Sequence, residues 1–100
     1  MQRQAAVAGQ FYAADGGQLR SDLAALLPEV RGSKKVTGII APHAGYVYSG
    51  AIAGQVYASI AIPATVLILG PNHHGSGAGA ALYPDGEWMT PLGPVVINAR

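Results

Sequence analysis

The sequence predicts an α/β fold with a mostly parallel sheet, flanking helices and at least one βαβ unit. Two short apolar runs, at residues 36–41 and 64–69, are each bounded by glycine or proline. Such runs are typical of strands buried on both faces. Residues 50–60 between them have the length and composition of a helix. Strand, helix and strand over about thirty residues predict parallel strands joined by a right-handed crossover.

The composition supports strands that are buried on both faces, and it predicts that part of the apolar surface is left exposed. The chain has 100 residues, of which 50% are hydrophobic and 11% are charged, against roughly 25% charged in ordinary globular domains. A short chain of this kind would leave apolar area exposed. We therefore expect residues 1–100 to be the N-terminal portion of a single larger α/β domain, in preference to an oligomer.

Several classes of function are excluded or disfavoured by composition. The net charge of +1 provides no basic patch for nucleic acid. There are no cysteines, which excludes disulfides and thiolate ligands from these residues. No apolar run reaches the ~18 residues of a membrane span, and the N-terminus lacks the layout of a signal peptide. We expect a cytoplasmic protein that binds neither nucleic acid nor membranes.

The first helix is expected between residues 15 and 27. Asp15-Gly16-Gly17 forms a turn at its start, with Asp15 near the positive end of the helix dipole. Pro28 should end it at about Leu27, because proline disfavours a helical conformation in the preceding residue. Apolar side chains recur on one face of this helix. They are Leu19, Leu23, Leu26, Leu27 and Val30.

A second helix is expected over about residues 50–60, with Ser49 as its cap. Its small residues allow its backbone to lie close to a sheet. They are Ala51, Ala53, Gly54 and Ala58.

The C-terminal part of the chain predicts shorter elements. Residues 75–79 are rich in glycine and predict a flexible loop. Residues 80–83 are a candidate third strand, and Asp85-Gly86 is a hairpin signal before an edge-like strand at residues 94–98.

Each of the two buried runs is followed by a proline and then a histidine. His43 follows Pro42, and His73 follows Pro71-Asn72. Ligands of open α/β sheets bind at the carboxyl edge, where both imidazoles would lie. Adjacent strands are ~4.8 Å apart and a metal lies ~2.1 Å from an imidazole nitrogen. Histidines on adjacent strand ends can therefore share one metal ion, although the sequence leaves strand adjacency open.

The three histidines are assigned different roles. A single loop histidine is more often a hydrogen-bonded loop residue than a ligand, but two at strand ends favour a shared site. We assign His43 and His73 as metal ligands. Sequence neighbours point in different directions, so His74 is assigned as a candidate catalytic acid or base.

A third ligand is not evident from the residues. With a carboxylate, two histidines suit non-haem Fe(II), and with other third ligands zinc is the usual metal. The nearest carboxylates lie in predicted turns, where a charged side chain is normally explained by its exposure to solvent. They are Asp15, Asp85 and Glu87.

The motifs resemble those of the Memo family, also called the AmmeMemoRadiSam system protein B family. The set spans nearly the whole chain in the family's order, and it is specific as a set although no single motif is. The matching pieces are Ala6 to Tyr12, Ala41-Pro42-His43-Ala44-Gly45-Tyr46, Tyr48-Ser49-Gly50, Leu69 to His74, and Trp88 with Thr90-Pro91-Leu92-Gly93.

The resemblance implies a fold similar to class III extradiol ring-cleaving dioxygenases. It implies that His43 and His73 lie in a dioxygenase-like pocket, with iron or copper as the candidate cofactor. The third ligand, often a cysteine in the family, would come from later sequence and is absent from this chain. The alanine- and glycine-rich composition looks prokaryotic, where the family is associated with a radical-SAM partner.

Three functions are compatible with these observations. The first is a metal-dependent oxidoreductase of the extradiol dioxygenase type, which this chain alone is not expected to perform. The second is a non-catalytic protein that binds a peptide or small ligand in the same pocket. The third and least favoured is a structural domain whose histidines only pack.

Overall fold

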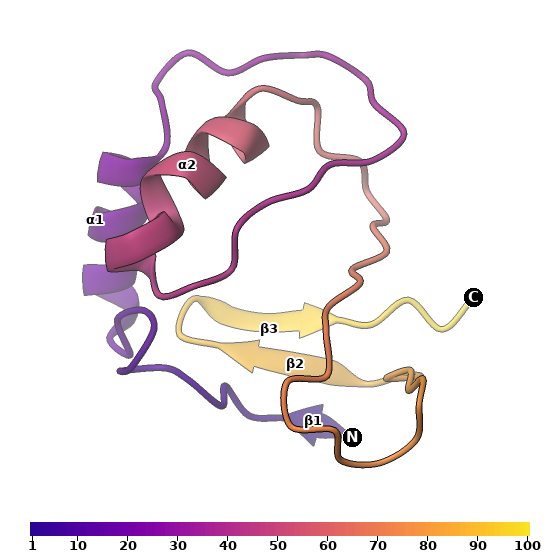
Figure 1. Cartoon of the computed structure of the whole chain (residues 1–100). Coiled ribbons are helices and arrows are strands. Elements are labelled where there is room, and N and C mark those ends of the chain that lie inside the picture. The colour runs from indigo at the N-terminus through magenta and orange to yellow at the C-terminus, as the bar shows by residue number, and fades with distance from the viewer.

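The computed structural model describes residues 1–100 and contains two helices and a three-stranded sheet. In Figure 1 the helices lie side by side above the sheet, and long segments without regular structure connect them. The α/β class is confirmed. In chain order the elements are β1 (Gln2–Arg3), α1 (Gly16–Leu26), α2 (Tyr46–Ala58), β2 (Glu87–Thr90) and β3 (Gly93–Val96).

Helix α1 forms where the sequence predicts it. Asp15 is its N-cap, and the Asp15 carboxylate accepts a hydrogen bond of 2.8 Å from the Gln18 backbone N–H. This contact satisfies one of the free donors of the first turn. Leu27 leaves the helical conformation just before Pro28, as expected. Leu19 is its one buried residue, with 4% of its surface exposed.

Helix α2 begins earlier than expected, at Tyr46 in place of residue 50. The expectation that Ser49 caps this helix is wrong, because the N-cap is Gly45. The Tyr46 backbone N–H donates to the Phe11 carbonyl at 2.8 Å, which gives one of the free donors of the first turn an acceptor. The segment between β1 and α1 (residues 4–15, the N-terminal arm) therefore contacts the start of α2, and no local signal in the sequence indicates that contact.

The small residues of α2 pack against helix α1, which corrects the expectation that they would lie against a sheet. Gly50 and Gly54 are both buried and face Leu26 of α1. A Cβ atom added at Gly54 would lie only 2.5 Å from the Leu26 carbonyl oxygen. Glycine at this position therefore permits close approach of the two backbones. Neither helix has the length and hydropathy needed to span a lipid bilayer.

The sheet is mixed, with the order β1-β2-β3. Strand β1 pairs parallel with β2, and β2 pairs antiparallel with β3. The hairpin turn lies at Pro91-Leu92, between β2 and β3. The expectation of a hairpin at Asp85-Gly86 is wrong, as is the strand at residues 80–83, because Gly86 instead leads into β2 beside the N-terminus of the chain. The edge-like strand expected at 94–98 is found, as β3.

Residues 36–41 and 64–69 are not strands in this structure, which corrects their predicted positions. Both are irregular segments, and large parts of their apolar side chains are exposed, as at Ile40 (94%) and Leu69 (86%). A strand that is apolar on both faces needs neighbouring strands and covering layers. None of the 100 residues provides them here, so the predicted βαβ unit lacks its sheet pairing.

Candidate functional site

His43 and His73 come together in the structure. Their Nε2 atoms are 3.2 Å apart, and the ring centroids lie 5.3 Å apart with the planes tilted by 38°. Both histidines follow segments that run in the same direction from a parallel bridge between Lys34 and Ile60. The two segments thus meet at each end, although they form no ladder in between.

The loop Pro42 to Gly45 carries His43 directly into helix α2. The Ser49 hydroxyl, one turn into the helix, donates a 3.0 Å hydrogen bond back to the Ala44 carbonyl. This bond closes the loop against the helix and fixes the backbone next to His43. Ser49 therefore supports the loop and does not cap the helix, a role that its position in the sequence does not indicate.

His73 lies in a turn that is held by the side chain of Asn72. Its amide donates to the Ser76 carbonyl at 2.7 Å, and its carbonyl accepts from the Gly75 backbone N–H at 3.0 Å. Gly75 has φ of 67°, a left-handed conformation that glycine adopts without strain. An asparagine three residues before a glycine is a recognisable turn signal. This signal marks an ordered turn at the start of the segment that is expected to be a flexible loop.

The separation of the two nitrogens is compatible with two kinds of contact. Two nitrogens bound to one metal at ~2.1 Å would lie ~3.0 Å apart in cis octahedral geometry and ~3.4 Å apart in tetrahedral geometry. The observed 3.2 Å lies between these values. It is also suitable for an N–H···N hydrogen bond between two neutral imidazoles in which one Nε2 carries the proton. Two neutral imidazole nitrogens are a donor set that iron, copper and zinc accept.

The other candidate residues form no hydrogen bond with this pair. His74 is exposed in the turn and makes no hydrogen bond. Asp15 caps α1, and the Glu87 carboxylate accepts a hydrogen bond from the Gln2 side chain at 3.1 Å. No cluster of three or more His, Cys, Asp or Glu residues suitable for a metal ion occurs in the chain.

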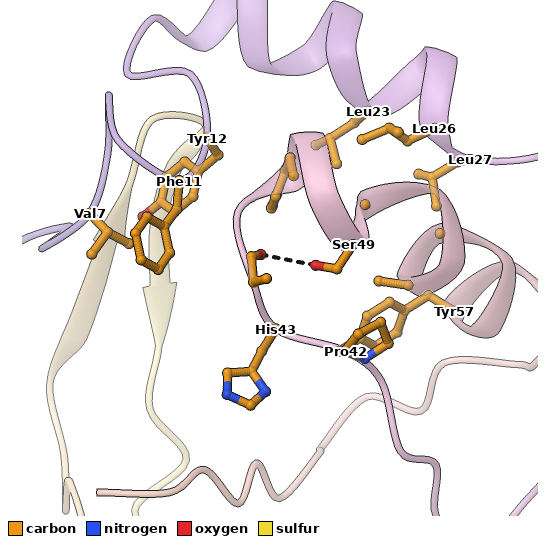
Figure 2. A pocket seen from close by; sticks show the side chains of 15 residues that line it. Val7, Phe11, Tyr12, Leu23, Leu26, Leu27, Pro42, His43, Ser49 and Tyr57 are labelled. Atoms are coloured by element: carbon orange, nitrogen blue, oxygen red, sulfur yellow. Dashed lines mark hydrogen bonds between the residues drawn. The ribbon is translucent and has the colours of Figure 1, made fainter. Parts of the chain in front are cut away.

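A cavity of about 310 Å³ lies between helices α1 and α2 and the N-terminal arm, and His43 forms part of its lining. Figure 2 shows Phe11 and Tyr12 on one side of it, with His43 at the lower edge of the view. Ten of its fifteen lining residues are hydrophobic and none is Asp, Glu, Lys or Arg. The cavity could therefore accept an uncharged, apolar group that extends towards His43.

Tyr46, like Tyr12, is half-buried and lines this cavity. Burial raises its pKa above the ordinary value of 10.0, and the neighbouring phenols of Tyr12 and Tyr57 add to the increase. The rings of Tyr12 and Tyr46 have centroids 5.5 Å apart. Tyr48, by contrast, is 86% exposed and does not line the cavity.

Comparison with known proteins defines the family. The family model described as "Memo-like protein" matches residues 3–100. This chain belongs to the Memo-like family. The match includes both His43 and His73 and both helices, so the family assignment covers every part of the candidate site described above.

Curated relatives support the same assignment. A MEMO1 family protein of Methanopyrus kandleri is 45% identical, and the match covers 100% of this chain and 40% of the relative. A MEMO1 family protein of Pyrococcus abyssi is 47% identical, and the match covers 100% of this chain and 36% of the relative. A MEMO1 family protein of Methanothermobacter thermautotrophicus is 42% identical, and the match covers 100% of this chain and 40% of the relative. The chain thus spans well under half the length of these relatives, and no solved structure gave a significant match.

Proposed function

We propose that this Memo-like protein binds a redox-active metal, iron or copper, through the imidazoles of His43 and His73. The observation that carries the proposal is the 3.2 Å distance between the two Nε2 atoms, which suits two ligands of one ion. Ligands that are brought together before the metal binds lose little conformational freedom on binding. Such a metal, when bound, supplies oxidation–reduction chemistry of the kind used by extradiol dioxygenases.

The chain's own residues would prepare this site. The hydrogen bond from Ser49 to Ala44 holds the backbone beside His43, and the Asn72 side chain holds the turn after His73. His74 is exposed to solvent next to the site and is able to exchange a proton with a bound molecule, as the candidate acid or base. The cavity beside His43 would hold the apolar part of a substrate away from water.

Metal content tests this proposal. The protein is loaded with Fe(II) without oxygen, or with Cu(II), and the metal that remains after desalting is measured for the wild type, His43→Ala, His73→Ala and His74→Ala. We expect both ligand variants to lose metal and His74→Ala to retain it, with helix content by circular dichroism confirming that each variant folds. Equal metal content in all four proteins would exclude the site.

A second candidate function is non-catalytic binding of a small apolar ligand or peptide side chain. The specific observation in its favour is the uncharged cavity of about 310 Å³, which is at the small end of the usual range for ligand pockets. In this case the histidines would only hydrogen-bond to the ligand, and no metal would be needed.

A pair of variants on α2 tests the cavity itself. Ala53 lines the cavity, whereas Ala51 is exposed on the same helix and does not. Ala53→Leu should reduce the fluorescence gain of anilinonaphthalene sulfonate, because the added methyl groups fill the space, whereas Ala51→Leu should leave it unchanged. Equal fluorescence in both variants would mean that the probe does not use this cavity.

A further inference from the structure

A second cavity of about 470 Å³ lies between helix α1 and the hairpin of β2 and β3. Leu19 and Leu23 of α1 line one side of it, and residues 90–95 of the hairpin line the other. The hairpin turn approaches the start of α1 closely, since a Cβ atom added at Gly16 would lie 2.5 Å from the Pro91 carbonyl oxygen. This contact brings the hairpin against the helix that forms the opposite wall.

The second cavity adjoins the cavity beside His43. Three residues line both cavities, so their side chains form the partition between the two spaces. They are Tyr12, Leu23 and Tyr46. The rings of Tyr12 and Tyr46 have centroids 5.5 Å apart, with the planes tilted by 38°. In Figure 2, Tyr12 lies on the side of the first cavity where the pale ribbon of the hairpin passes.

The two tyrosine rings of this partition are attached to a fixed backbone. The Tyr12 carbonyl accepts a 2.7 Å hydrogen bond from the Gly9 N–H, and the Tyr46 N–H donates to the Phe11 carbonyl at 2.8 Å. Neither phenol makes a hydrogen bond within the chain. Rotation of the rings therefore breaks no hydrogen bond and leaves the N-terminal arm and α2 in place. Such a rotation joins the two cavities into one space.

The chemistry of the lining restricts what this space can hold. No lining residue of either cavity is Asp, Glu, Lys or Arg. An ion would lose its hydration there without gaining a charged partner. The phenols of Tyr12 and Tyr46 stand between the two cavities, and each can donate and accept a hydrogen bond. Apolar walls with a few such polar groups are typical of small-molecule sites.

We propose that the two cavities form one binding site for an elongated, uncharged aliphatic molecule whose central oxygen binds the phenols of Tyr12 and Tyr46. One apolar arm of the ligand lies beside His43, and the other lies against the hairpin. The proposal rests on the second candidate function, ligand binding in the first cavity, and extends it by naming the ligand class and a second compartment. It requires no metal at His43 and His73.

Two ketones that differ in one arm test the joined site. Hexan-2-one and nonan-5-one share a butyl arm, but the other arm is a methyl group in the first and a butyl group in the second. Isothermal titration calorimetry of the metal-free chain measures the Kd of each ketone. Burial of three further CH₂ groups in the second cavity should lower the Kd of nonan-5-one to about one-fiftieth of that of hexan-2-one.

Val95 and Val96 provide a matched pair of variants. Val95 lines the second cavity, whereas Val96, the next residue of β3, does not line it and is 74% exposed. Neighbouring side chains of a strand point to opposite faces. Val95→Phe should raise the Kd of nonan-5-one towards that of hexan-2-one and leave hexan-2-one unchanged. Val96→Phe should change neither value.

Removal of the phenolic hydroxyls tests the polar contact. The double variant Tyr12→Phe and Tyr46→Phe keeps both rings, and it should raise the Kd of both ketones by about fivefold because the carbonyl loses its donor. Tyr48→Phe is the control, since Tyr48 is 86% exposed and lines neither cavity. Circular dichroism confirms that each variant keeps its helix content.

Each contrary result has a distinct meaning. Equal Kd values for the two ketones in the wild type would confine the ligand to the first cavity, which overturns the joined site and leaves the candidate binding function intact. Equal effects of Val95→Phe and Val96→Phe, or of the double tyrosine variant and Tyr48→Phe, would also overturn the joined site. Failure of both ketones to bind would overturn the proposal together with the binding function on which it rests.

Discussion

Gly54→Ala is expected to separate helices α1 and α2. The new Cβ would lie 2.5 Å from the Leu26 carbonyl oxygen and 3.1 Å from its carbonyl carbon. Both atoms belong to backbone, which cannot rotate away as a side chain can. Overpacking of this kind costs about 1–3 kcal/mol, while alanine gains about 1 kcal/mol over glycine in a helix.

Gly50→Ala is the matched control, because it adds the same methyl group one turn earlier in α2. Its Cβ would meet the Leu26 Cδ1 atom at 2.9 Å, the end of a flexible side chain. The helix-propensity gain is common to both variants and cancels in the comparison. The free energy of unfolding should therefore be about 1–3 kcal/mol lower for Gly54→Ala than for Gly50→Ala.

Urea unfolding followed by circular dichroism measures this difference. Helix content at zero denaturant shows whether either variant is already unfolded. Equal stability of the two variants would refute the claim that α1 and α2 approach most closely at Gly54. If Gly54→Ala were more stable than Gly50→Ala, the close approach of the two helices at Gly54 would be refuted more strongly, because no overpacking would then oppose the gain in helix propensity.

Two further predictions concern α1 and the cavity. Asp15→Ala should lower the free energy of unfolding by about 1 kcal/mol, because the Gln18 N–H loses its acceptor, whereas Asp15→Asn should change it little in the same urea titration. The raised pKa of Tyr46 means that the folded chain holds the phenolic proton more tightly than the unfolded chain. The stabilisation that comes from this tighter proton binding by Tyr46 is fully present below pH 10. It is lost as the pH rises through the folded-state pKa. Tyr46→Phe should therefore lose less stability than the wild type when the melting temperature is compared at neutral and strongly alkaline pH, and identical losses would contradict this account.

The sequence predicted the local elements better than the long-range ones. Helix α1 was predicted closely because Asp15 and Pro28, the signals for its ends, are local. The start of α2 was missed because it depends on the distant carbonyl of Phe11. The pairing of β1 with β2 was also missed, since it joins Gln2 to Glu87 across almost the whole chain. Contacts at such separations leave no periodic pattern to detect.

The candidate site shows both the value and the limit of the sequence argument. His43 and His73 are expected at a common edge because each follows an apolar run, and the structure places their Nε2 atoms 3.2 Å apart. The strands that motivated this expectation do not form, and no backbone–backbone hydrogen bond pairs residues 36–41 or 64–69 with another segment. The apolar cavity is formed by α1, α2 and the N-terminal arm together, so no single segment indicates it.

Counting the imidazoles bound to one metal tests the central claim most directly. Cu(II) is added at one equivalent, and pulsed electron paramagnetic resonance detects the remote nitrogen of each bound imidazole. We predict two imidazoles in the wild type and in His74→Ala, and one in either His43→Ala or His73→Ala. The same number of imidazoles in His43→Ala and His73→Ala as in the wild type would contradict a shared site at this pair.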